Sequence, residues 1–211
     1  MIILKLAGGI IGFVFGVVLC NLIWEDTESE HSISSKKINL YYLISGIFMG
    51  CAFLCASHNF EAGHCIDSMF MLGGLIFLAA FAIQDILQLA VYAFLLNVGV
   101  IGMLLLRCTV FMFDGEFTKM FSFLIISGTV YVGLKIIAKV FPKFMGAGDY
   151  DILFLVFLLC GIEGTYQVLF ASSLAGLLIC IPLLLSKRIQ KGEKIPLAPF
   201  FYLGTLAYLW M

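Results

Sequence analysis

The feature that most constrains this chain is an apolar run from Met69 to Leu106 that contains one charged residue, Asp85. A bilayer core is about 30 Å thick and a helix rises about 1.5 Å per residue, so one straight helix of this length would be nearly twice too long. The chain must turn inside the run, and we expect the turn at the polar cluster of Gln84, Asp85 and Gln88. The run therefore predicts two consecutive membrane helices.

The same apolar character extends along the whole chain. Of its 211 residues, 63% are hydrophobic and 12% are charged, against about 25% charged residues in a soluble domain. Apolar runs of the length that crosses a bilayer predict an all-α, polytopic membrane helix bundle with about eight transmembrane helices, and seven is an equally defensible count. The predicted spans are 3–24, 39–57, 67–86, 90–106, 119–138, 149–162, 165–185 and 196–211. We expect residues 1–211 to form a single transmembrane domain with no soluble domain.

The basic residues predict how the bundle lies in the membrane. With eight spans and the N-terminus outside, most lysines and arginines fall in or beside cytoplasmic loops, as the positive-inside rule requires. These are Lys36, Lys37, Lys135, Lys139, Lys143, Lys187, Arg188, Lys191 and Lys194, whereas Lys5, Arg107 and Lys119 fall on the other side. This orientation places Asp85 and Asp149 at the cytoplasmic ends of their helices. The net charge of −1 gives no reason to expect a nucleic-acid partner.

The cysteines do not predict a metal site. None of the seven forms a paired Cys-x-x-Cys motif, which zinc ribbons use. Cys51 and Cys55 share a helix face, with His58, His64 and Cys65 soon after. We favour packing of small apolar thiols in the bundle over metal binding there. We expect no metal and no cofactor.

Asp149 ends a Gly146-Ala-Gly-Asp stretch at the start of a predicted span. Charge inside a membrane is costly, so such acids usually face a cavity, a partner or a pathway. Gly146 and Gly148 favour irregular backbone and close approach of another segment. Together with Asp85, Asp149 forms a candidate aspartyl dyad. The alternative is that Asp149 only caps its helix, as Asp151 would also do.

Three passages of the chain resemble the type IV prepilin peptidases, which belong to the GxGD intramembrane aspartyl proteases. Lys143-Phe-Met-Gly-Ala-Gly-Asp-Tyr-Asp-Ile-Leu resembles the second-aspartate motif of that family. Ala82-Ile-Gln-Asp-Ile-Leu resembles the end of its first-aspartate helix, and Ile195-Pro-Leu-Ala-Pro-Phe-Phe its Pro-x-x-Pro start of the last helix. The first helix, Gly12-Phe-Val-Phe-Gly-Val-Val-Leu-Cys-Asn, is also similar to the opening span of the family. The passages occur in the family's order and extend over nearly the whole chain.

The resemblance implies an aspartic endopeptidase of the cytoplasmic (inner) membrane. Asp85 and Asp149 would be its catalytic residues, with Gly146 and Gly148 as the supporting motif. The implied partners are prepilin or pseudopilin precursors in the lipid bilayer, whose short basic leader is cut at the cytoplasmic face. Asp151 is a candidate contact for that leader.

The chain departs from the family pattern at three places. No proline follows Asp85 within Leu89-Ala-Val-Tyr92, and Asp151 stands where the family usually has lysine. The short segment from Glu25 to Ile38 replaces a cysteine-rich insertion linked to N-methylation, which argues against methyltransferase activity. Two other functions fit intramembrane acids: a catalytically inactive membrane scaffold of a pilus or secretion system, and a proton-coupled transporter.

Overall fold

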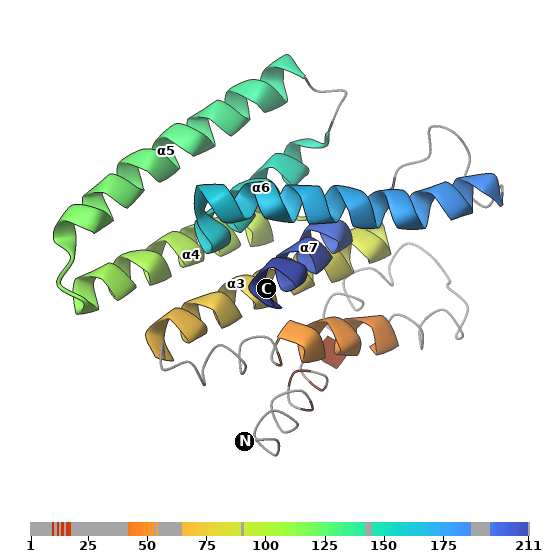
Figure 1. Cartoon of the computed structure of the whole chain (residues 1–211), viewed down its shortest axis with the longest axis horizontal. Helices are drawn as coiled ribbons and strands as arrows, with labels where there is room; N and C mark the ends of the chain where they lie inside the picture. The colour runs from red at the N-terminus through yellow and green to blue at the C-terminus, as the bar shows by residue number, and fades with distance from the viewer. Residues whose placement is uncertain are drawn as a thin grey trace.

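The computed structural model describes residues 42–52, 54, 65–89, 91–141, 145–186 and 195–210, with isolated helical positions between Ile10 and Val17. This part of the chain is all-helical, without strands (Figure 1). A short helix, Tyr42–Ala52, is orange in Figure 1. It is followed by α3 (Cys65–Gln88), α4 (Ala93–Phe113), α5 (Phe117–Val140), α6 (Ala147–Leu185) and α7 (Ala198–Trp210).

Four of these helices are long and apolar enough to cross a membrane, at 70–88, 93–113, 117–140 and 148–185. They are compatible with the predicted multi-pass membrane protein. The described residues contain fewer such helices than the eight predicted for the whole chain. Helix α7 has 13 residues and is shorter than the predicted span 196–211. The predicted span 39–57 extends on both sides of Tyr42–Ala52 into residues that the structure does not describe. The predicted span 3–24 lies outside the described residues except for its isolated positions.

The predicted turn after Asp85 is confirmed. Helix α3 ends at Gln88, and Leu89 adopts a positive φ of 51°. The side chain of Gln84 is fully buried, and its Oε1 accepts a hydrogen bond from the backbone N–H of Tyr92 at 3.3 Å. Tyr92 is the N-cap residue of α4, so this amide joins the end of α3 to the start of the next helix.

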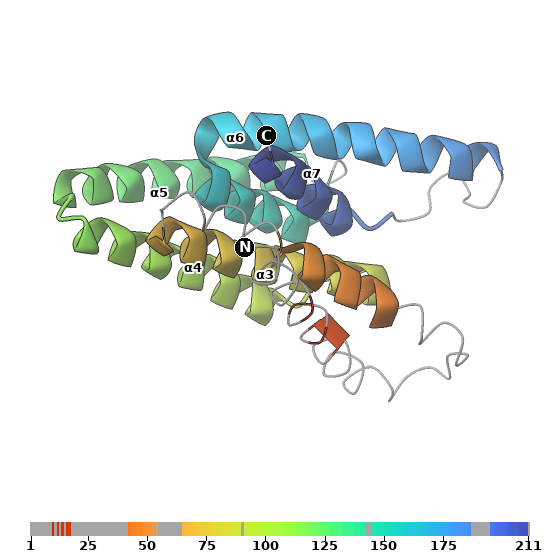
Figure 2. The same cartoon turned by 60° about the horizontal axis from the view of Figure 1, so that its bottom comes forward.

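Helix α6 consists of two helical parts that meet at Gly161. Its φ of 71° and ψ of −174° interrupt the helix, and this backbone region is essentially restricted to glycine. The chain turns back at this point, so the two parts run in opposite directions (Figures 1 and 2). They correspond to the predicted spans 149–162 and 165–185. The predicted boundary between these spans lies a few residues after the observed break at Gly161.

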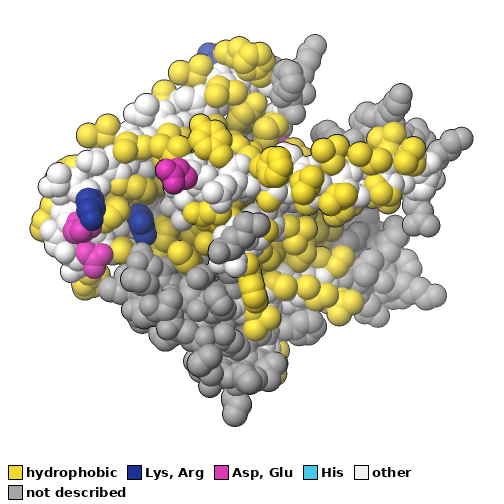
Figure 3. All heavy atoms as spheres, viewed as in Figure 1, with side chains coloured by type: hydrophobic (Ala, Val, Ile, Leu, Met, Phe, Trp, Pro, Cys, Tyr) yellow, Lys and Arg dark blue, Asp and Glu magenta, His cyan; other side chains and the backbone are white. Residues whose placement is uncertain are grey.

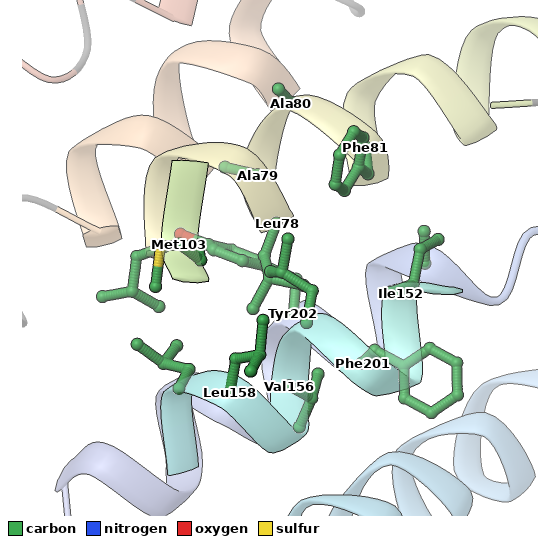
Figure 4. Close-up of a cluster of buried hydrophobic side chains, with 14 of the residues drawn as sticks. Leu78, Ala79, Ala80, Phe81, Met103, Ile152, Val156, Leu158, Phe201 and Tyr202 are labelled. Atoms are coloured by element: carbon green, nitrogen blue, oxygen red, sulfur yellow. The ribbon is translucent and has the colours of Figure 1, made fainter. Parts of the chain in front are cut away.

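The buried core lies where α3, the first part of α6 and α7 meet. Leu78 and Phe81 of α3, Ile152 and Val156 of α6, and Tyr202 of α7 are among its fully buried side chains (Figure 4). The hydroxyl of Tyr202 also donates a hydrogen bond to the carbonyl of Phe48, which joins α7 to the helix Tyr42–Ala52. Thus α7 is too short to be a candidate span but lies at the centre of the packing.

The outward faces of the helices are apolar. On α5 the only buried residue is Ser127, while large side chains such as Phe121, Ile125 and Ile136 are exposed. Hydrophobic side chains are spread widely over the described helices on the face shown in Figure 3. A surface of this kind matches hydrocarbon, where exposed apolar side chains carry no hydration penalty.

Candidate active site

Asp85 lies in the last turn of α3 and is held by the start of α7. Only 8% of the residue is exposed, and its Oδ2 accepts a hydrogen bond from the backbone N–H of Ala198 at 3.0 Å. The backbone of Leu197 also hydrogen-bonds this carboxylate. The first N–H groups of a helix have no partner within the helix and form the positive end of its dipole, so they suit a carboxylate.

The sequence at the start of α7 explains why these N–H groups are available. Pro199 occupies the first turn of the helix, where its missing N–H costs nothing and its fixed φ is already helical. Pro196 restricts the residue before it to extended backbone. The Pro-x-x-Pro passage therefore starts the helix sharply, and Leu197 and Ala198 between the prolines donate to Asp85.

Asp149 lies in the first turn of α6 and caps that helix. Its Oδ2 accepts a hydrogen bond from the backbone N–H of Gly146 at 3.0 Å, which is the reciprocal part of a capping box. The capping interaction expected as an alternative is therefore present. It uses one of the two carboxylate oxygens, so it is compatible with a further role for the acid.

The two glycines before Asp149 differ in their importance. Gly146 has an extended, non-helical backbone, but neither glycine has a positive φ, so the backbone angles alone do not require glycine at either position. A Cβ on Gly146 would lie 3.1 Å from Asp149 Oδ2, whereas a Cβ on Gly148 would meet only Leu96 at 3.9 Å. Gly146 thus leaves room for the capping carboxylate, and nothing in the structure requires glycine at position 148.

Asp85 and Asp149 lie near enough for the charge of one to act on the other. The two carboxylates come from α3 and α6, which pack against each other, and they interact electrostatically. Each carboxylate is held by a backbone N–H at a helix start: Asp149 by that of α6 and Asp85 by that of α7. Two carboxylates that approach each other away from water cannot both ionise cheaply, so such a pair is suited to hold one proton between them.

Asp151 points away from this pair toward α5. Its Oδ1 forms an ion pair with Lys135 Nζ at 2.5 Å, and this lysine also lies 5.2 Å from the ring of Tyr131. Lys135 belongs to helix α5, so this ion pair joins α5 to α6. Asp151, predicted as a contact for a basic leader, already has a basic partner in the protein.

A cavity of about 430 Å³ lies between the second part of α6 and the start of α7. Its lining includes Met145 and Leu197, which directly precede Gly146 and Ala198, the two residues whose N–H groups hold the acids. Sequence analysis missed this cavity and the backbone donors of α7. The Pro-x-x-Pro passage could have indicated the backbone donors, because it marks the start of α7. The cavity could not be found in this way, because it forms between segments that are distant in the sequence.

The structure contains no candidate metal cluster of three His, Cys, Asp or Glu residues within its described ranges. Cys55, His58 and His64, considered for such a site, lie outside those ranges. Cys51, Cys108, Cys160 and Cys180 are free thiols.

The chain matches no protein-family model, no curated protein and no solved structure. Its function is therefore inferred from the chemistry of the site.

Proposed function

We propose that this protein is a membrane-embedded aspartic endopeptidase whose catalytic residues are Asp85 and Asp149. The observation that carries the proposal is that two acids from different helices, each held by a backbone N–H at a helix start, lie within electrostatic range of each other. Neither acid forms an ion pair within the described part of the chain. Ionisable residues in membrane segments are expensive, and their retention usually marks a functional site. A pair of interacting carboxylates is the group that aspartic proteases use to activate water.

In the proposed reaction one carboxylate is ionised and the other is protonated. The ionised acid accepts a proton from water while the protonated acid donates to the carbonyl oxygen of the scissile peptide. A C–O bond forms, and the C–N bond then breaks as a proton passes to the leaving amine. Either acid can take either role, because the proton belongs to the coupled pair. The backbone N–H groups of Gly146 and Ala198 limit rotation of the two side chains, which keeps them positioned for the reaction.

The location of the pair at helix ends supports an endopeptidase over a transporter. Asp85 lies in the last turn of α3 and Asp149 in the first turn of α6. Acids at helix ends lie near a membrane boundary, where water and a polypeptide can both reach them, whereas proton-coupled transporters place their sites near the bilayer midplane. We assign this boundary to the cytoplasmic side of the inner membrane, with the N-terminus outside, because of the distribution of basic residues.

The proposed substrates are precursors with a short basic leader followed by an apolar segment, as in prepilins and pseudopilins. The sequence resemblance at both aspartate motifs supports this substrate class. No contact for the basic leader is assigned to Asp151, because Lys135 already neutralises it.

The test is cleavage by the full-length protein in liposomes. The probe is a synthetic peptide with a short Lys- and Arg-rich leader followed by about 20 apolar residues, and mass spectrometry identifies the products. We expect cleavage after the leader by the wild type and at least a roughly 100-fold loss in Asp85→Asn and Asp149→Asn. Asp114→Asn, which changes an exposed acid in the α4–α5 connection, is the matched control. Absence of cleavage by the wild type favours the inactive scaffold, and full activity of Asp149→Asn excludes the aspartyl mechanism.

A further inference from the structure

Gln84 is a buried polar side chain that directly precedes Asp85 in the last turn of α3. It is fully buried, and its Oε1 accepts a hydrogen bond from the backbone N–H of Tyr92 at 3.3 Å. Its Nε2 has no hydrogen-bond partner within the described part of the chain. A buried amide that is only half satisfied is no better for stability than an apolar side chain of the same length. The role of Gln84 therefore lies in the one bond that it makes.

This bond closes a strained turn. Leu89 follows the last residue of α3 with a φ of 51°, a left-handed backbone that is unfavourable for a residue with a Cβ. Its N–H donates to the carbonyl of Asp85 at 2.9 Å, and three residues later Tyr92 is the N-cap of α4. The bond from Tyr92 to Gln84 spans this turn, so it opposes relaxation of the strained Leu89 backbone.

A chain of contacts leads from Gln84 to the start of α6. The backbone N–H of Tyr92 donates to Gln84, and the carbonyl of Tyr92 accepts from the N–H of Leu96 at 3.1 Å. Leu96 is buried, and its Cδ1 lies 3.9 Å from the position that a Cβ on Gly148 would take. The chain begins at the residue before one acid and ends at the residue before the other. The start of α4 therefore connects the two segments that carry the acid pair.

We propose that Gln84 is a positioning residue for the acid pair. By fixing the start of α4, it sets the end of α3 relative to the start of α6, and so the carboxylate of Asp85 relative to that of Asp149. This inference rests on the proposed endopeptidase function and assigns it a residue that acts through the backbone of α4. Placement matters for such a pair, because a displacement of about 1 Å can lower a catalytic rate about 100-fold.

The first test compares two glutamines of the same turn. Gln84→Met keeps the length of the side chain but removes the acceptor for the Tyr92 N–H. Gln88→Met is the matched control, because the Nε2 of Gln88 donates to the hydroxyl of Tyr92 instead, at 3.3 Å. We expect Gln84→Met to lower kcat for the leader peptide at least about 10-fold with KM unchanged, since the acids act in the transition state. Gln88→Met should match the wild type. Equal kcat values for the two variants would overturn the proposal while leaving the endopeptidase function in place.

The second test separates positioning from folding. Gln84→Met removes the unpartnered Nε2 together with the bond to Tyr92, so the two effects offset each other and the Tm should stay near that of the wild type. The double variant Gln84→Met/Leu89→Gly should recover kcat, because glycine adopts a positive φ without steric strain and the turn then closes without the bond. A loss of kcat that follows a loss of Tm, or no recovery in the double variant, would contradict the positioning role.

The third test measures the placement of the two side chains without cleavage. Asp85→Cys and Asp149→Cys are combined in a full-length protein whose seven natural cysteines are replaced by alanine, and a bifunctional maleimide with a short rigid spacer joins the two thiols. We expect cross-linking when Gln84 is present, a clear loss of cross-linked product on adding Gln84→Met, and no loss on adding Gln88→Met. Equal cross-linking with both additions, or none with Gln84 present, would overturn the proposal, independently of whether the wild type cleaves.

Discussion

The carboxylate of Asp85 accepts a hydrogen bond from the backbone N–H of Ala198, 3.0 Å away and 113 residues further along the chain. This bond joins the end of α3 to the start of α7 and satisfies a helix N-terminus that is buried in the bundle. Asp85 thus supports the fold and belongs to the proposed catalytic pair. Substitutions that keep or remove its oxygen atoms should separate these two roles.

Asp85→Asn and Asp85→Ala should both be inactive, but they should differ in stability. The amide oxygen of asparagine can still accept from Ala198, whereas alanine leaves that buried N–H without a partner, at a cost of about 1–3 kcal/mol. Thermal unfolding in detergent should therefore show a lower Tm for the alanine variant than for the asparagine variant. Equal Tm values for both would contradict the supporting role of the bond.

The double variant Asp85→Asn/Asp149→Asn should be no less active than either single variant. The two acids act as one unit in the proposed reaction, and removal of either member already abolishes it. Neither single substitution should lower the Tm, because the asparagine oxygen can still accept the hydrogen bond from the backbone N–H of Ala198 or Gly146. The measurement is peptide cleavage at matched protein levels, and a further loss of activity in the double variant would show that the acids act separately.

Asp151→Asn should retain most of the cleavage activity but lose stability. It breaks the ion pair with Lys135, which is partly exposed, so we expect a loss of about 1 kcal/mol. The double variant Asp151→Asn/Lys135→Gln should recover much of this loss, because no charge is then left without a partner. Loss of cleavage in Asp151→Asn at normal Tm would instead assign this acid to the active site.

Gly161→Ala should destabilise the protein through the break in α6. At a φ of 71° and ψ of −174°, a residue with a Cβ is strained by about 1–3 kcal/mol. Gly128→Ala provides the opposite control, because this helical glycine has open space around it and alanine favours a helix by up to about 1 kcal/mol. Thermal unfolding of the two variants should move in opposite directions. A stabilising Gly161→Ala would mean that α6 is continuous.

The local pattern of the sequence was sufficient to predict most of the described helices. The apolar runs at 67–86, 90–106 and 119–138 correspond to α3, α4 and α5, because a run of that length can satisfy its backbone in a membrane only as a helix. The turn after Gln88 followed from the limit that bilayer thickness sets on one helix. The two isolated acids and the Gly146 motif were visible for the same reason, since charge in an apolar run is rare.

Other features depend on contacts between segments that are distant in the sequence. The short length of α7, its N–H bond to Asp85 and the pairing of Asp151 with Lys135 could not be predicted. Neither an apolar run nor an isolated charge specifies which helix will lie beside it. Composition and periodicity report the surroundings that each segment requires, namely lipid, core or water. Tertiary packing alone decided which N–H, carboxylate or ammonium group becomes the partner of each polar side chain, and which acids lie near each other.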